Sequence, residues 1–202
     1  MCGKLVVNTG SMFSGKTTEL LRQGKRHVLA KQEVLYIKPD VDTRYSDDKI
    51  VSHTGEFTDA LILSPDEMIY DIQEVDNADV LLVDEVQFFD EGMALQLNQL
   101  VNDGKTVYVS GLDLDFKGKP FMTVALLMAF ADEVNKFKAV CSDCGSDAYV
   151  SAMIEMTHER VTLGSDDKYK PVCRRCYDKH IFDLILKEMN KGVNRWQKKA
   201  VI

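Results

Sequence analysis

The stretch that decides the fold lies near the N-terminus and reads Gly10-Ser11-Met12-Phe13-Ser14-Gly15-Lys16-Thr17. An apolar run, Leu5 to Val7, precedes it, and a segment with helical periodicity follows it. The spacing G-x-x-x-x-G-K-[ST] between a strand and a helix is typical of a phosphate-binding P-loop. Its glycines let successive backbone N–H groups point at phosphate oxygens, and the helix adds the positive end of its dipole.

Two side chains at the end of this loop have chemical roles in the P-loop hypothesis. Lys16 reaches the β- and γ-phosphates, and the Thr17 hydroxyl binds Mg²⁺. The alternative is a chance match in a glycine-containing turn. The strand before the motif and the helix after it are the context that a P-loop requires, so we predict an ATP and phosphate site over residues 10–17.

Length and composition favour a globular protein with one large domain, or a domain with a small appendage. The chain has 202 residues, of which 45% are hydrophobic, and this suffices for a core. Its formal net charge of −7 argues against a nucleic-acid partner. The N-terminus has no cationic segment followed by an apolar one, and no run approaches the roughly 18 apolar residues of a membrane span. We therefore expect a cytoplasmic protein with no membrane contact.

Alternating apolar segments predict an α/β fold with a parallel sheet and right-handed crossovers. Ser64-Pro65-Asp66-Glu67 reads as a capping box and predicts a helix of about ten residues after it. Residues 40–48 are too polar for a core element and predict a loop. Other strands are expected over residues 5–7, 34–37, 57–63, 80–83 and 106–109, and helices over 18–31 and about 93–101.

Two acidic residues, Asp84 and Glu85, directly follow the continuous apolar run Val80 to Val83. Such a run predicts a strand buried on both faces, and its carboxyl end lies at the edge where α/β sheets bind ligands. A Walker B aspartate at this place helps to hold Mg²⁺ in P-loop proteins. We therefore predict that Asp84 and Thr17 bind magnesium.

The sequence changes character after about residue 135. The pairs Cys141-x-x-Cys144 and Cys173-x-x-Cys176, 28 residues apart, have the spacing of a zinc ribbon with an extended insertion. A redox dithiol or a catalytic zinc are alternatives, but four cysteines close a tetrahedral site and favour structural Zn²⁺. We expect a P-loop domain over residues 1–135, a zinc-binding domain over 136–190 and a flexible tail over 191–202. The second unit should contain strands over 149–156 and 160–163 and a helix over 177–190.

Five segments in collinear order carry a family resemblance. They are Gly10 to Thr17, Asp42-Thr43-Arg44-Tyr45-Ser46, Asp84-Glu85-Val86-Gln87-Phe88-Phe89, Gly111-Leu112-Asp113-Leu114-Asp115-Phe116 and Lys168 to Tyr177. The set resembles the type II thymidine kinases over about residues 4 to 180. The resemblance implies a nucleotide-salvage enzyme that uses ATP to phosphorylate thymidine or deoxyuridine at the 5′-hydroxyl. It also implies a RecA-like core, a zinc-bearing lasso domain that closes over the nucleoside, and a homotetramer.

The resemblance also implies roles for individual residues. Glu85 matches the general base, because a 5′-hydroxyl is a weak nucleophile and a carboxylate must accept its proton. Arg44 and Gln87 match groups at the triphosphate, and Arg44 can neutralise charge on the transferring phosphoryl group. The residues matched to the nucleoside site are Met12, Asp42, Phe88, Leu112, Phe116, Ser151, Leu163, Gly164 and Tyr169. Core packing is the alternative role for the apolar members of this set.

Two departures from the family pattern concern base selectivity. Ser151 stands where many members have Thr, with Ala152-Met153 in place of a basic pair, and Ser165 stands where others have Gly or Ala. Two rival hypotheses remain. One is a nucleotide-dependent switch without enzymatic activity, which has no reason to carry both the Asp42-to-Ser46 segment and the cysteine pairs. The other is a kinase for a different nucleoside or for a nucleoside monophosphate.

Overall fold

The computed structural model describes residues 3–42, 48–52, 55–154 and 168–182. Six strands form the central sheet: β1 (Lys4–Gly10), β2 (Val34–Pro39), β5 (Leu61–Leu63), β6 (Val80–Val83), β7 (Thr106–Gly111) and β8 (Glu133–Phe137). They are parallel and lie in the order β5-β2-β6-β7-β1-β8. The α/β class and the parallel sheet predicted from the sequence are therefore confirmed.

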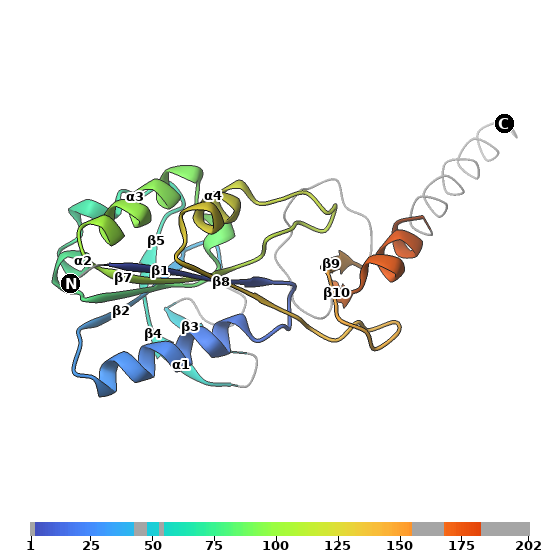
Figure 1. Ribbon diagram of the computed structural model, residues 1–202, viewed down its shortest axis with the longest axis horizontal. Coiled ribbons are helices and arrows are strands. Elements are labelled where there is room, and N and C mark those ends of the chain that lie inside the picture. Colours follow the sequence, from blue (N-terminus) through green and yellow to red (C-terminus); the bar gives the residue numbers. More distant parts are fainter. Residues whose placement is uncertain (1–2, 43–47, 53–54, 155–167, 183–202) are drawn as a thin grey trace, which may run out of the picture.

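Helices cover both faces of this sheet (Figure 1). The main helices are α1 (Lys16–Leu29), α3 (Glu91–Asn102) and α4 (Met122–Phe130), and the shorter ones are η1 (Ile69–Asp71), α2 (Gln73–Asn77) and η2 (Val86–Phe88). One core lies between α1 and the sheet, and a larger one lies beneath α3 and α4. Because β6 is sandwiched between the two, its residues are 0% exposed. Among the described residues, no helix is both long enough and apolar enough to span a membrane.

The parallel register aligns the carboxyl ends of the three central strands. Val7 of β1 and Val83 of β6 both pair with Val109 of β7. The residues that follow these strands therefore meet at one edge of the sheet. They are the P-loop after β1, the acidic pair after β6 and the segment from Leu112 after β7.

The predicted helix after the capping box is wrong. The Glu67 carboxylate does accept a hydrogen bond from the Ser64 N–H at 2.9 Å, but the Ser64 hydroxyl donates to Asp40 instead of capping a helix. Ile69 is buried, and its N–H donates to the Gln96 side chain of α3 at 2.8 Å. Because these tertiary contacts take the polar groups, only a turn, η1 and α2 form here.

The strand predicted over residues 57–63 consists of two strands. β4 (Phe57–Asp59) pairs antiparallel with β3 (Lys49–Val51), whereas β5 joins the central sheet beside β2. The break falls at Ala60, whose N–H donates to the Asp48 carbonyl at 3.2 Å. No glycine or proline lies within residues 57–63, so the sequence does not mark the change of sheet.

The C-terminal described part is a small unit beyond the sheet edge (Figure 1). β9 (Val150–Met153) and β10 (Tyr169–Val172) pair antiparallel, and a helix covers residues 174–182. This helix begins three residues before the predicted start, and its predicted remainder to residue 190 lies outside the described residues. The strand predicted over 160–163 and the tail over 191–202 also lie outside them.

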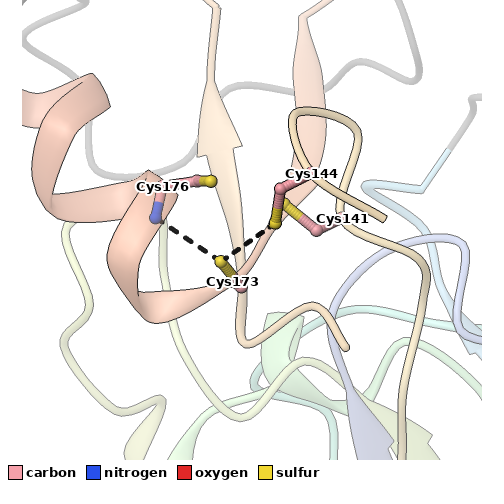
Figure 2. A group of neighbouring side chains, drawn as sticks. All are labelled: Cys141, Cys144, Cys173 and Cys176. Atoms are coloured by element: carbon pink, nitrogen blue, oxygen red, sulfur yellow. Dashed lines mark hydrogen bonds between the residues drawn. The ribbon is translucent and has the colours of Figure 1, made fainter. Parts of the chain in front are cut away.

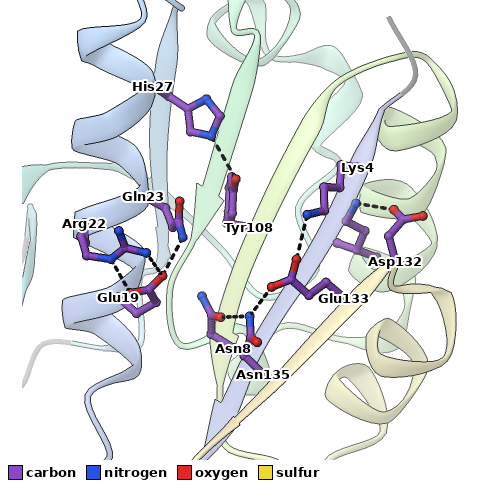
Figure 3. Close-up of polar contacts among 11 residues, drawn as sticks. Lys4, Asn8, Glu19, Arg22, Gln23, His27, Tyr108, Asp132, Glu133 and Asn135 are labelled. Carbon is purple, nitrogen blue, oxygen red and sulfur yellow. Dashed lines mark hydrogen bonds and ion pairs between the residues drawn. The ribbon is translucent and has the colours of Figure 1, made fainter.

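α4 and β8 have no counterpart among the predicted elements, and polar contacts attach β8 to the sheet. Lys4 of β1 donates to Glu133 of β8 at 2.8 Å, and Asn135 donates to both Asn8 and Glu133 (Figure 3). On the same side of the sheet, His27 of α1 hydrogen-bonds the Tyr108 hydroxyl at 3.0 Å. The proposed domain boundary near residue 135 falls within β8.

The packing of α3 predicts a large difference between two leucines two residues apart. Leu97 is fully buried in the core beneath α3, whereas Leu95 on the same helix is 58% exposed. Leu97→Ala should lower the free energy of unfolding by about 2 to 5 kcal/mol, because it leaves a cavity. Leu95→Ala should change it by less than about 0.5 kcal/mol. Urea denaturation measures both values, and equal effects would contradict the orientation of α3.

Candidate active site

The P-loop connects β1 to α1 at the edge of the sheet. Gly10 has φ 138°, and a Cβ there would lie 2.2 Å from the Phe137 carbonyl oxygen, so the turn requires glycine. Lys16 begins α1, is 7% exposed, and donates from Nζ to the Ser11 carbonyl at 2.9 Å. The Ser11 and Ser14 hydroxyls are buried and have no hydrogen-bond partner among the described residues. Buried donors without a partner suit a loop that binds a polar ligand.

A pocket open to solvent lies above the P-loop, with about 720 Å³ of space when the adjoining solvent is included. Its wall is formed by Met12 to Thr18, by Lys38, Asp42 and residues 49–51, and by Asp84, Glu85 and Leu112. The sequence motifs that follow β1 and β6 therefore line one cavity. Asp42, predicted to contact the nucleoside, lines it as well.

Two lysines in this wall were not predicted. Lys38 of β2 is 2% exposed, and its Nζ lies 3.8 Å from an Asp42 carboxylate oxygen and 3.3 Å from the Lys49 carbonyl. A charged residue directly after the apolar run 34–37 is the signal that could have revealed it, because buried lysine is rare unless it has a partner. Lys49 also lines the pocket, and its Nζ lies 3.7 Å from an Asp59 carboxylate oxygen and 4.8 Å from the centroid of the Phe57 ring.

Asp84 and Thr17 face each other below the pocket. The Thr17 hydroxyl donates to Asp84 at 3.1 Å, and the Ser110 hydroxyl and the Glu85 N–H also donate to this carboxylate. Burial raises the pKa of Asp84 to about 6, and the nearby Glu85 charge adds to this, although the Ser110 hydrogen bond opposes it. A hydroxyl beside a buried carboxylate offers the hard oxygen ligands that Mg²⁺ prefers.

Glu85 has an unusual backbone conformation at the start of η2. Its φ of 50° and ψ of 40° are left-handed, which costs a residue other than glycine roughly 1 to 2 kcal/mol. The side chain is half-buried and lines the pocket. Its carboxylate accepts a hydrogen bond from the Gln87 side chain, whose own oxygen accepts one from the Leu112 N–H at 3.0 Å. Gln87 is buried and is not among the described residues that line the pocket.

The structure brings most of the predicted nucleoside residues together. Met12, Phe116, Met153 and Tyr169 form a buried apolar cluster, against which Phe13 and Leu112 pack. The Ser151 hydroxyl accepts a hydrogen bond from the Met12 N–H at 2.8 Å and so connects the P-loop to β9. Phe88 is half-buried in η2 and lies outside this cluster. Arg44, Leu163 and Gly164 lie outside the described residues.

The four predicted metal ligands converge in the C-terminal unit (Figure 2). The sulfur atoms of Cys141, Cys144, Cys173 and Cys176 all lie within 4.8 Å of one another. Four thiolates about 2.3 Å from a tetrahedral Zn²⁺ are about 3.8 Å apart, so the cluster has the size that a metal requires. A hydrogen bond from the Ser146 side chain lowers the pKa of Cys144 to about 6, and one with Cys173 raises the pKa of Cys176 to about 12.

Two hydrogen bonds connect the helix at residues 174–182 to the apolar cluster. The Tyr177 hydroxyl donates to the Phe116 carbonyl at 3.0 Å, and His180 Nε2 lies 2.6 Å from the Met153 carbonyl. Cys176 lies on this helix, and Cys173 directly precedes it. The same short helix therefore joins the cysteine site to the apolar cluster.

The chain is similar in sequence to several known proteins. The family model described as thymidine kinase matches residues 3–177. A thymidine kinase of Bacteroides fragilis (strain YCH46) is 43% identical over 178 residues, which are 88% of each chain. A thymidine kinase of Rhodothermus sp. (strain ITI 518) is 42% identical over 87% of this chain and 81% of its own. The thymidine kinase of Pyrobaculum aerophilum is 42% identical over 86% of this chain and 97% of its own.

Proposed function

This chain belongs to the thymidine kinase family, and from that premise we propose that it transfers the γ-phosphoryl group of ATP to the 5′-hydroxyl of thymidine and of deoxyuridine. One observation carries the proposal. The P-loop and Glu85 line the same pocket, and Met12 and Leu112 connect this pocket to the apolar cluster around Phe116. Phosphates and a pyrimidine can therefore lie side by side, with a carboxylate between them.

The phosphate end of the site holds ATP with Mg²⁺. The backbone of residues 10–17 and the Lys16 ammonium bind the β- and γ-phosphates, and Thr17 and Asp84 hold the metal ion. Bound magnesium offsets the negative charge of the phosphates. Arg44 completes this set as a further cation at the transferring phosphoryl group, a role taken from the family resemblance.

Glu85 accepts the proton of the 5′-hydroxyl as the new bond to phosphorus forms. Its carboxylate is at the pocket wall, and the left-handed backbone sets its direction. Strained conformations of this kind persist where the surrounding structure fixes them, and they are common at active sites. Water activation for ATP hydrolysis would use the same carboxylate, so the choice of acceptor depends on the nucleoside pocket.

The pyrimidine occupies the apolar end of the site. Phe88 and Phe116 lie near the base, Met12 and Leu112 near its 5-methyl group, and Tyr169 anchors the lasso segment. The family resemblance assigns hydrogen bonding of the pyrimidine edge to the backbone of Leu163 and Gly164. Ser151 lacks the methyl group of threonine, so the pocket beside the base is slightly wider than in many family members, and deoxyuridine analogues with a larger 5-substituent should enter it.

Cys141, Cys144, Cys173 and Cys176 hold a structural Zn²⁺ that fixes both ends of the lasso segment. Four cysteines leave no coordination position for water, which favours a structural over a catalytic zinc. Reduced thiolates suit the cytoplasm, where we place the protein. We further propose a homotetramer, on the family resemblance alone. Size-exclusion chromatography with light scattering measures the assembly.

An assay over a panel of nucleosides and nucleoside monophosphates tests the proposed substrate. Thymidine should be phosphorylated fastest, with deoxyuridine second, when phosphorylated product is followed with labelled ATP. ATP hydrolysis that no nucleoside accelerates would instead favour the nucleotide-dependent switch. Preference for a purine nucleoside or a monophosphate would leave the kinase chemistry in place and refute the substrate.

Glu85→Gln tests the general base. The amide retains the size of the side chain but cannot accept the proton, so kcat should fall about 10²- to 10⁴-fold with little change in ATP affinity. Steady-state kinetics with thymidine measures kcat, and Glu91→Gln at the exposed start of α3 is the control. Near-normal turnover in the Glu85 variant would rule out this assignment.

Lys16→Met tests the phosphate site. Loss of the ammonium group removes the charge that binds the β- and γ-phosphates, so both ATP affinity and turnover should fall. Calorimetry with ATP and Mg²⁺ measures the affinity. Lys25→Met changes a lysine on the same helix whose side chain is 61% exposed, and it should leave ATP binding intact. Undiminished ATP affinity in the Lys16 variant would mean that the loop is not the nucleotide site.

Removal of the metal tests the proposed division of labour between the two units. Metal analysis should find about one Zn²⁺ per chain. Cys173→Ser or chelation should raise the KM for thymidine far more than that for ATP, because the lasso must then be ordered during nucleoside binding. Circular dichroism should retain most helix and sheet signal, and Cys2→Ser is the control. Equal loss of ATP and thymidine binding, or full activity without metal, would contradict this role.

A further inference from the structure

We infer that Gln87 is a positioning residue, whose buried amide holds the Glu85 carboxylate in place by connecting it to the backbone of Leu112. This inference rests on the proposed role of Glu85 as general base. It assigns Gln87 a function through another side chain instead of through the triphosphate, where the family resemblance places it.

The hydrogen bonds of the Gln87 amide run from the base to the next strand of the sheet. Nε2 donates to a Glu85 carboxylate oxygen, and Oε1 accepts from the Leu112 N–H at 3.0 Å. Each polar atom of the amide thus has a protein partner. The residue before Leu112 is also fixed, because the Gly111 carbonyl accepts a hydrogen bond from the Thr9 hydroxyl of β1 at 3.0 Å. The carboxylate is therefore tied to the strand end from which the P-loop begins.

Gly111 provides the space that this bridge needs. A Cβ at position 111 would lie 2.8 Å from Gln87 Oε1 and 2.9 Å from a Val86 side-chain carbon. Gln87 itself is only 6% exposed, so packing restricts its amide to few orientations. Because its oxygen is held by the Leu112 N–H, the buried amide can hold the Glu85 carboxylate rigidly through its nitrogen.

A neutral support suits the proposed base better than a cation would. A lysine or arginine at position 87 would stabilise the charged Glu85 carboxylate more strongly and weaken its ability to accept a proton. The amide of Gln87 orients the Glu85 carboxylate and stabilises its negative charge less than a cation would. Leu112 also lines the pocket and packs against the apolar cluster. The hydrogen bonds through Gln87 therefore set the distance between the Glu85 carboxylate and the nucleoside end of the site.

Gln87→Met is the test, because methionine has a similar length and no hydrogen-bonding amide. Misplacement of a catalytic group by about 1 Å can cost about 100-fold in rate, so kcat with thymidine should fall about 10- to 100-fold. The KM for ATP should change less than about 3-fold, because Gln87 is not proposed to touch the phosphates. In the Glu85→Gln background, Gln87→Met should reduce kcat by less than about 3-fold, because the carboxylate through which Gln87 acts has been replaced.

Gln96→Met is the matched control for loss of a buried glutamine. Gln96 is 9% exposed, and its Oε1 accepts the Ile69 N–H at 2.8 Å, far from the pocket in the core beneath α3. It should lower the melting temperature about as much as Gln87→Met and leave kcat unchanged. If Gln87→Met does not fold, Gly111→Ala provides the same test. Its methyl group should displace the Gln87 amide, while the Glu85 and Gln87 side chains are both retained.

The outcomes separate this inference from the proposed function. A slow Glu85→Gln enzyme together with a normal kcat in the Gln87 variant would overturn the inference alone. A large rise in the KM for ATP at unchanged kcat would assign Gln87 to the phosphates and overturn it as well. Losses that multiply in the double variant would show that Gln87 acts independently of Glu85. Normal turnover in Glu85→Gln would refute the base, and with it the premise.

Discussion

The site depends on the register of the parallel sheet. Because β1, β6 and β7 end at the same level, the P-loop, Asp84 and the segment from Leu112 meet without any long connection. A shift of one residue in β6 would turn the acidic pair to the opposite face. The continuous burial of Val80 to Val83 on both faces opposes such a shift, so hydrophobic packing determines where the carboxylates stand.

The sequence predicts an element well where local pattern and tertiary environment agree. β6 matches its predicted bounds, because a continuous apolar run has few alternatives to a buried strand. α4 carries apolar residues on nearly all sides, so it lacks the amphipathic period from which a helix can be predicted. β8 contains Glu133, Asn135 and Lys136, and its place in the sheet depends on partners more than 100 residues away. Such long-range contacts leave no local signal.

The residues of the candidate site likewise differ in whether a local sequence pattern predicts them. Lys16, Asp84 and the four cysteines belong to sequence motifs that indicate their chemistry. In the structure, Lys16 and Asp84 line one pocket, and the four cysteines lie together in a second site. Lys38 belongs to no motif, and only its position at the end of an apolar strand distinguishes it. The hydrogen bond between Gln87 and Leu112 joins residues 25 apart in the chain, and no local sequence pattern predicts that they are partners.

The hydrogen bond between the Met12 N–H and the Ser151 hydroxyl has a consequence for how selectivity can evolve. Its donor belongs to the backbone, so every residue except proline at position 12 retains it. Its acceptor belongs to a side chain, so position 151 must keep an oxygen. The two sides of the proposed base pocket therefore differ in how freely their residues can change. Mutational drift and protein engineering can reshape the pocket through the side chain at position 12, while position 151 remains restricted to a few residue types.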